Sequence, residues 1–413
     1  MAFAPRSGAR TLWRYLRAER RTLRQGLGAL LLSTGAGIVA GVTLGSIRHT
    51  LLLLPSLFIL LPAATGMKGT IFGAIGARLG TSSHAGLFEV SRERGSVLYQ
   101  NVYAGIITSF SSALYLAVLA RASAAAFGLH SISLLDFITI SVLGGLLGSA
   151  IQMVLTVGLS VVSIRRGYDL DAVSTPLVTA SGDMVTIPSL YLATFLVRVP
   201  WLNATIASVA IAVCVYATVR GAMTDLPLAR RAILEMTGVI VLTPILDILA
   251  GTVVEPRIAR FATYPALLVI IPPLVSNAGA LGGILSSRLS SKLHLGVISA
   301  RARPEGPAVL DAALVASFGL VAFALVGVLG YAYGQLVGKS LGPGVMIGGT
   351  LLAGMLATVV AIVVGYYVAV ISARFGLDPD NQSVPVITSV MDLAGVLSFL
   401  LVLALLGVTT IHG

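Results

Sequence analysis

Residues 165–183 read RRGYDLDAVSTPLVTASGD, and residues 374–392 read RFGLDPDNQSVPVITSVMD. Both stretches carry an arginine, a glycine, two aspartates, a serine, a proline, a threonine and a final aspartate at the same spacing. Asp183 therefore aligns with Asp392, and Thr179 aligns with Thr388. Agreement over so many positions indicates that the chain contains an internal repeat.

A second pair of stretches lies at nearly the same separation. The residues of the first that recur in the second are Pro55, Pro62, Gly69, Gly73, Arg78, Leu79, His84 and Gly86, which align with Pro265, Pro272, Gly279, Gly283, Arg288, Leu289, His294 and Gly296. Two separate blocks that agree on nearly one offset predict a duplicated unit. We place the repeats at 26–198 and 231–413, after a basic N-terminal segment, 1–25, and on either side of a linker, 199–230.

Composition determines the environment of these repeats. Of the 413 residues, 56% are hydrophobic and 10% are charged, whereas a soluble chain carries roughly 25% charged residues. The net charge of +11 lies in short basic segments between apolar runs, which is not the pattern of a nucleic-acid-binding face. The single Cys214 excludes a disulfide within the chain. An all-α polytopic membrane protein is expected.

Apolar stretches long enough to cross a bilayer predict eleven spans. They are 26–47, 51–77, 96–120, 134–163, 173–197, 201–219, 232–254, 262–287, 308–333, 343–372 and 382–408. Most of the 27 Lys and Arg residues then fall on the side of the N-terminus, which predicts a cell-membrane protein with a cytoplasmic N-terminus and an external C-terminus. The span at 201–219 has no counterpart in either repeat. This extra crossing gives both five-span units the same orientation across the membrane. We therefore expect parallel repeats related by a pseudo-twofold axis along the membrane normal.

Charged residues within the spans are the main functional signal, because a charge in hydrocarbon is costly and usually faces a cavity or a partner. Asp183 and Asp392 lie inside the last spans of their repeats, each four residues after a threonine, Thr179 or Thr388. A separation of four residues puts hydroxyl and carboxylate on one helix face. Oxygen ligands suit a hard divalent ion, and two carboxylates across an axis would bind Mg²⁺ with its water shell. The alternative is a structural polar pair.

The second spans carry glycine-rich patches around Gly69 and Gly279. Close helix packing explains such glycines. The functional alternative is a helix broken near Pro62 or Pro272, with carbonyls and the amide oxygen of Asn277 along a cation pathway.

Two further charges, Lys68 and Asp247, have no equivalent in the other repeat. Lys68 would repel a cation unless an acid neutralises it, and we expect its partner to be Asp392 or Asp247, in a structural or a gating role. Asp171 and Asp380 begin the last spans, where helix capping is the usual explanation. A metal-binding role for His84 and His294 is a minor alternative.

The last-span pattern up to Asp392 and the segment from Pro272 to Arg288 with its Asn-Ala-Gly core resemble the MgtE magnesium channels and their eukaryotic relatives, the magnesium solute carriers with two fused MgtE-like domains. The resemblance covers both repeats. It implies a pore between two five-helix domains, with the ion bound by the last-span aspartates, Asp183 and Asp392. One chain of this fused type can complete a pore alone. No segment is long enough for the cytosolic magnesium-sensing domains of MgtE, so that gating is not implied.

The resulting expectation is a divalent cation transporter or channel, with Mg²⁺ as the transported ion and no cofactor. We find no nucleophile with a base in the spans, and therefore expect no enzyme. The alternative is a proton- or sodium-coupled carrier of another substrate. Channel transport and Na⁺-coupled exchange of the divalent ion both remain open.

Overall fold

The computed structural model describes residues 20–84, 88–91, 93–166, 170–375 and 384–408, and it contains no strand within them. Ten helices of this described part are long and apolar enough to cross a membrane. An eleventh helix lies where the span at 173–197 is predicted, and its described apolar part is Ser181–Val197. The predicted class, an all-α polytopic membrane protein, is confirmed.

The first repeat and the linker contain α2 (Arg20–Ser46), α3 (Arg48–Leu53), α4 (Leu57–His84), α5 (Val97–Ala126), α6 (Leu134–Thr139), η1 (Ile140–Gly144), α7 (Gly145–Arg166), α8 (Leu170–Val197) and α9 (Pro200–Ala222). The second repeat contains α10 (Pro227–Val254), η2 (Glu255–Arg257), α11 (Ile258–Thr263), α12 (Pro265–His294), α13 (Gly306–Leu336), η3 (Gly344–Gly349), α14 (Thr350–Phe375) and α15 (Val384–Leu405).

The second long helix of each repeat begins later than its apolar run suggests. The run that begins at residue 51 is divided between α3 and α4, because Ser56 has a left-handed backbone with φ 65°. Its hydroxyl donates to the His130 carbonyl at 2.6 Å, and its N–H donates to Glu255 Oε1 at 2.6 Å. These bonds satisfy the backbone at the bend, so the chain can turn before α4 starts.

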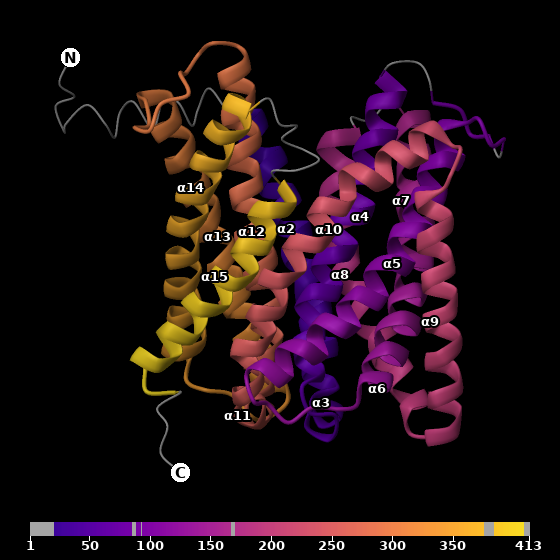
Figure 1. Ribbon diagram of the computed structural model, residues 1–413. Helices are drawn as coiled ribbons and strands as arrows, with labels where there is room; N and C mark the ends of the chain where they lie inside the picture. Colours follow the sequence, from indigo (N-terminus) through magenta and orange to yellow (C-terminus); the bar gives the residue numbers. More distant parts are fainter. Residues whose placement is uncertain (1–19, 85–87, 92, 167–169, 376–383, 409–413) are drawn as a thin grey trace.

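The first long helix of each repeat packs against the second long helix of the other repeat. Helix α2 packs along α12, and α10 packs along α4. Figure 1 accordingly shows α2 beside α12 and α13, and α10 beside α4 and α5. Glycines allow the contact: a Cβ on Gly251 would lie 2.7 Å from Cα of Ile59, and a Cβ on Gly41 would overlap the Val269 carbonyl. Gly41 and Gly251 are equivalent positions of the two repeats.

Helices α4 and α12 remain continuous through their prolines, Pro62, Pro272 and Pro273. The predicted break near Pro62 or Pro272 is therefore wrong for these helices. A proline frees the carbonyl four residues earlier, and for Pro273 that is the Val269 carbonyl, against which Gly41 packs. Such close backbone contact covers the freed carbonyl, which allows the helix to continue at membrane depth.

The two helix groups meet where α8 packs on α2 and α15 packs on α10. The linker helix α9 lies at the periphery against α5 and α6. The short helices α3 and α11 lie at the same end of the molecule (Figure 1), so α4 and α12 start from the same side. This is the arrangement expected of two units with one direction, although the pseudo-twofold axis itself stays a prediction.

Candidate functional site

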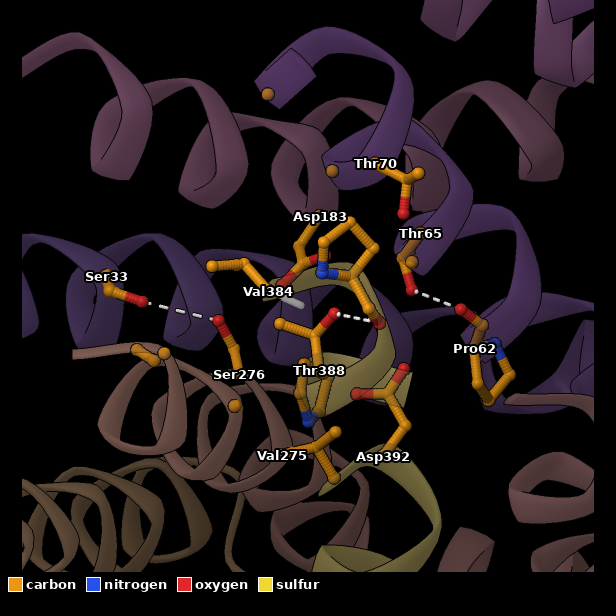
Figure 2. Close-up of a pocket in the computed structure, with 18 of the residues that line it drawn as sticks. Ser33, Pro62, Thr65, Thr70, Asp183, Val275, Ser276, Val384, Thr388 and Asp392 are labelled. Carbon is orange, nitrogen blue, oxygen red and sulfur yellow. Dashed lines mark hydrogen bonds between the residues drawn. The ribbon is translucent and has the colours of Figure 1, made fainter. Parts of the chain in front are cut away.

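A cavity of about 670 Å³ lies between the two helix groups. Its wall comes from both repeats: α2, α4 and α8 of the first, and α12, α13 and α15 of the second. The polar and glycine residues that line it are Gly26, Ser33, Thr65, Gly66, Gly69, Thr70, Gly73, Asp183, Ser276, Gly279, Gly283, Ser287, Arg288, Thr388 and Asp392. Figure 2 shows polar side chains of this set, among them Asp183, Thr388 and Asp392, arranged around the cavity.

Asp183 and Asp392 both line this cavity. They enter it from different helices, α8 and α15 (Figure 2), and Asp183 is near enough to Asp392 to interact with it electrostatically. Thr388 lies one turn before Asp392 and also lines the cavity, and its hydroxyl donates to the Pro385 carbonyl at 2.8 Å. The helical spacing therefore delivers threonine and aspartate of α15 to the same cavity.

The side chain of Thr179, the partner of Asp183 in the predicted pair, lies outside the described residues, as do the side chains of Asp171, Asp380, His84 and His294. Asn277 is described and fully buried. Its Nδ2 donates to the Thr34 hydroxyl at 2.9 Å, and its Oδ1 has no hydrogen-bond partner among the described residues. Asn277 is not among the cavity-lining residues; it lies in the contact between α12 and α2.

Gly69 and Gly279 occupy equivalent places in the cavity wall. A Cβ on Gly279 would lie 3.2 Å from the Thr388 methyl group, so this glycine allows α12 and α15 to approach each other closely. Helix packing and cavity lining, which the sequence offers as alternatives, coincide at this position.

Asp247 lies deep between α10, α4 and α15. Its exposure is 1%, and neither carboxylate oxygen has a hydrogen-bond partner among the described residues. A Cβ on Gly66 would lie 2.8 Å from Oδ2 of Asp247 and 3.4 Å from Oδ2 of Asp392. The two carboxylates thus converge beside Gly66, which itself lines the cavity.

Lys68 points away from these acids. Its ammonium group donates to the Gly145 carbonyl at 2.6 Å and to the Ser149 hydroxyl, both on α7. The predicted pairing of Lys68 with Asp392 or Asp247 is therefore wrong in this structure. Gly145 follows the π-helical turn η1, and this packing fixes the side chain on the far side of α4. A lysine at this position does not place its charge in the cavity.

Sequence reasoning missed several polar contributors to the wall. The Ser33 and Ser276 hydroxyls contact each other at 3.3 Å across the α2–α12 contact, and the Thr65 hydroxyl donates to the Pro62 carbonyl at 2.9 Å (Figure 2). Small hydroxyl residues are common in membrane spans, so their presence alone carries no functional signal. The signal that could have found Thr65 and Ser276 is their place next to Gly66 and Asn277, in the glycine-rich patches of the two repeats. Arg288 also lines the cavity, and it pairs with buried Asp311 at 2.8 Å.

The side chains available as cation ligands in this cavity favour an ion that keeps part of its water. Within the described residues, no three His, Cys, Asp or Glu side chains gather as ligands of one ion. Two carboxylates around a large space can instead hold a hydrated ion through its waters, as Mg²⁺ prefers.

Comparison with known proteins identifies the class. The MgtE family model, described as a divalent cation transporter, matches this chain twice, at residues 61–194 and 271–402. These segments cover well over half of the chain, and the protein belongs to the MgtE family of divalent cation transporters. It is accordingly a multi-pass membrane transporter and not an enzyme.

Among characterised proteins, the chain is similar to solute carrier family 41 member 2 of Mus musculus, with 24% identity over 88% of this chain and 67% of that protein. Solute carrier family 41 member 3 of Rattus norvegicus shares 23% identity over 88% of this chain and 83% of its own length. Among solved structures, the eukaryotic MATE transporter AtDTX14 is 13% identical, covers 96% of this chain and 97% of its own, and has a TM-score of 0.41, too low to support any argument.

Proposed function

We propose that this protein carries Mg²⁺ across the cell membrane through the cavity between its two repeats, and that Asp183 and Asp392 bind the hydrated ion there. The observation that carries the proposal is the convergence of two repeat-equivalent aspartates on one cavity. Carboxylates in a membrane-spanning segment are costly unless they serve a polar pathway.

The chemistry of the cavity supports Mg²⁺ over softer ions. Oxygen ligands prefer Mg²⁺, Ca²⁺ or Mn²⁺, whereas thiolate and imidazole ligands select other metals. The one cysteine, Cys214, is buried in α9, away from the cavity. Mg²⁺ loses water reluctantly, and a cavity of about 670 Å³ leaves room for an ion with its water shell.

The remaining features of the proposal follow from the repeats. Both halves of the cavity wall belong to one chain, so a monomer suffices for a pathway. The excess of Lys and Arg in alternate loops supports a cytoplasmic N-terminus and an external C-terminus. Coupling of transport to Na⁺ is part of the proposal. Asp247 adds a third carboxylate near the cavity, and one divalent ion does not neutralise three carboxylates.

The test is Mg²⁺ flux into proteoliposomes that contain the full chain, with and without a Na⁺ gradient. The wild type is expected to carry Mg²⁺, and Asp183→Asn is expected to lose most of the flux. Asp225→Asn, an exposed aspartate in the loop before α10, is the matched control and should retain it. Wild-type flux equal to that of empty liposomes would reject the proposed cargo, and full flux through Asp183→Asn would reject the proposed pathway.

A further inference from the structure

The carboxylate of Asp247 lacks the compensation that a buried charge requires. The side chain is 1% exposed, and neither oxygen accepts a hydrogen bond from a described residue. A carboxylate taken out of water is strongly destabilising unless a counter-charge or hydrogen bonds replace the lost hydration. The polar groups next to this carboxylate are the Ser389 hydroxyl and Asp392, which is itself an acid, so neither supplies a positive charge.

The geometry directs this carboxylate toward Asp392. Oxygens of both acids lie within 3.4 Å of the place where a Cβ on Gly66 would be, and Ser389 of α15 also interacts with Asp247. Two carboxylates and a hydroxyl, from α10 and α15, therefore converge beside the bare backbone of Gly66. Oxygen groups of this kind are cation ligands.

No basic side chain of the described part offers itself as the counter-charge here. Lys68 is turned to α7, where it donates to Gly145 and Ser149. Arg288, which lines the cavity, pairs with Asp311. One divalent cation between Asp183 and Asp392 neutralises two carboxylates, which leaves the charge of Asp247 for a single additional positive charge.

The other half of the protein cannot form the same site. The position equivalent to Asp247 is Gly37, where a Cβ would lie 2.7 Å from Cα of Pro273, so a carboxylate has no room there. The neighbouring contacts between α2 and α12 are the neutral pairs Ser33 with Ser276 and Thr34 with Asn277. Of the two equivalent positions, Gly37 and Asp247, the second alone therefore offers a carboxylate.

We propose that Asp247 and Asp392, with Ser389, bind one small monovalent cation that has lost most of its water, at a second site beside Gly66. A fully hydrated Mg²⁺ does not fit a position as enclosed as that of Asp247, and Mg²⁺ gives up its water reluctantly. The inference rests on the proposed function, because Asp392 belongs to both sites. The monovalent ion and the hydrated divalent ion share that carboxylate, so binding of one changes the affinity for the other.

The experiment measures thermal unfolding of the purified full chain at constant ionic strength in LiCl, NaCl, KCl or N-methylglucamine chloride. A ligand of the folded state raises the unfolding temperature in a concentration-dependent way. We expect LiCl or NaCl to stabilise the wild type relative to N-methylglucamine chloride. In Asp247→Asn the half-saturating salt concentration should rise by ~tenfold or more, because the variant loses a charged ligand of the cation.

A second variant tests the site without removing a charge. Gly66→Ala places a methyl group 2.8 Å from Asp247 Oδ2 and should abolish the salt-specific stabilisation. Gly238→Ala on α10 meets nothing within 4 Å and is its matched control. Equal stabilisation of the wild type by all four salts would overturn the proposal, as would wild-type behaviour of Asp247→Asn. Stabilisation by MgCl₂ that is lost in Asp247→Asn, without any monovalent effect, would also overturn it.

Failure of this inference is distinguishable from failure of the proposed function. Asp183→Asn removes an acid of the divalent site alone, so it should lose Mg²⁺ flux and retain the monovalent stabilisation. Retained Mg²⁺ flux in Asp183→Asn counts against the proposed pathway, whatever the monovalent salts do. Loss of the monovalent effect in Asp183→Asn would contradict two separate sites.

Discussion

Replacement of Asp392 by asparagine is expected to reduce Mg²⁺ flux more than any other single substitution in the cavity. Asp392 lines the cavity with Asp183 and also faces Asp247 beside Gly66. Interactions with a charged group are worth ~1.5–3 kcal/mol, so loss of this carboxylate should lower the flux by ~tenfold to a hundredfold. The measurement is the initial rate of Mg²⁺ uptake into proteoliposomes with equal amounts of inserted protein.

The neutral variant should remain folded. Asparagine is nearly isosteric with aspartate, and removal of a buried charge near two other acids relieves like-charge repulsion. Asp392→Asn is therefore expected to unfold at or above the wild-type temperature while it transports poorly. Normal transport by Asp392→Asn, with Asp225→Asn as the reference, would exclude Asp392 as an ion ligand.

The second large effect is expected in the contacts by which the repeats exchange their first helices. Gly41→Ala and Gly251→Ala each insert a methyl group against the backbone of a helix from the other repeat, near Val269 and Ile59. Backbone cannot yield as a flexible side chain does, so each substitution should destabilise the fold by ~3 kcal/mol or more. The readout is the unfolding temperature of the detergent-solubilised protein.

Two glycines on the same helices provide the controls. Gly35 of α2 and Gly238 of α10 have nothing within 4 Å of an added Cβ. Alanine there should be neutral or stabilising by up to ~1 kcal/mol, through helix propensity alone. If all four alanine variants had the same stability, the exchanged packing of α2 and α10 would be wrong.

The helical fold follows from the sequence because long apolar runs leave the backbone no alternative in a membrane. Helix partners do not follow in the same way. A helix face that contacts lipid and one that contacts protein are both apolar, so nothing in the run 232–254 predicts that α10 packs on α4 of the other repeat. The contact is encoded in single glycines such as Gly41 and Gly251, whose meaning depends on the facing helix.

The candidate site, like the fold, can be predicted from the sequence only in part. The repeat and the cost of intramembrane charge predict Asp183, Asp392 and Thr388, and all three line the cavity. Lys68 has the same sequence signal, but its long side chain can reach either neighbour of α4, and the choice of α7 depends on tertiary packing. The proximity of Asp247 to Asp392 likewise depends on the missing side chain of Gly66.

The central claim, a cation pathway between the repeats, is tested most directly by cysteine accessibility. In a Cys214→Ser background, Thr65→Cys and Ser276→Cys place one thiol in the cavity wall from each repeat. Our account predicts that a charged, membrane-impermeant thiosulfonate blocks Mg²⁺ flux at both positions, and that Mg²⁺ slows the modification. Complete modification of both cysteines with unchanged Mg²⁺ flux would contradict a pathway through this cavity.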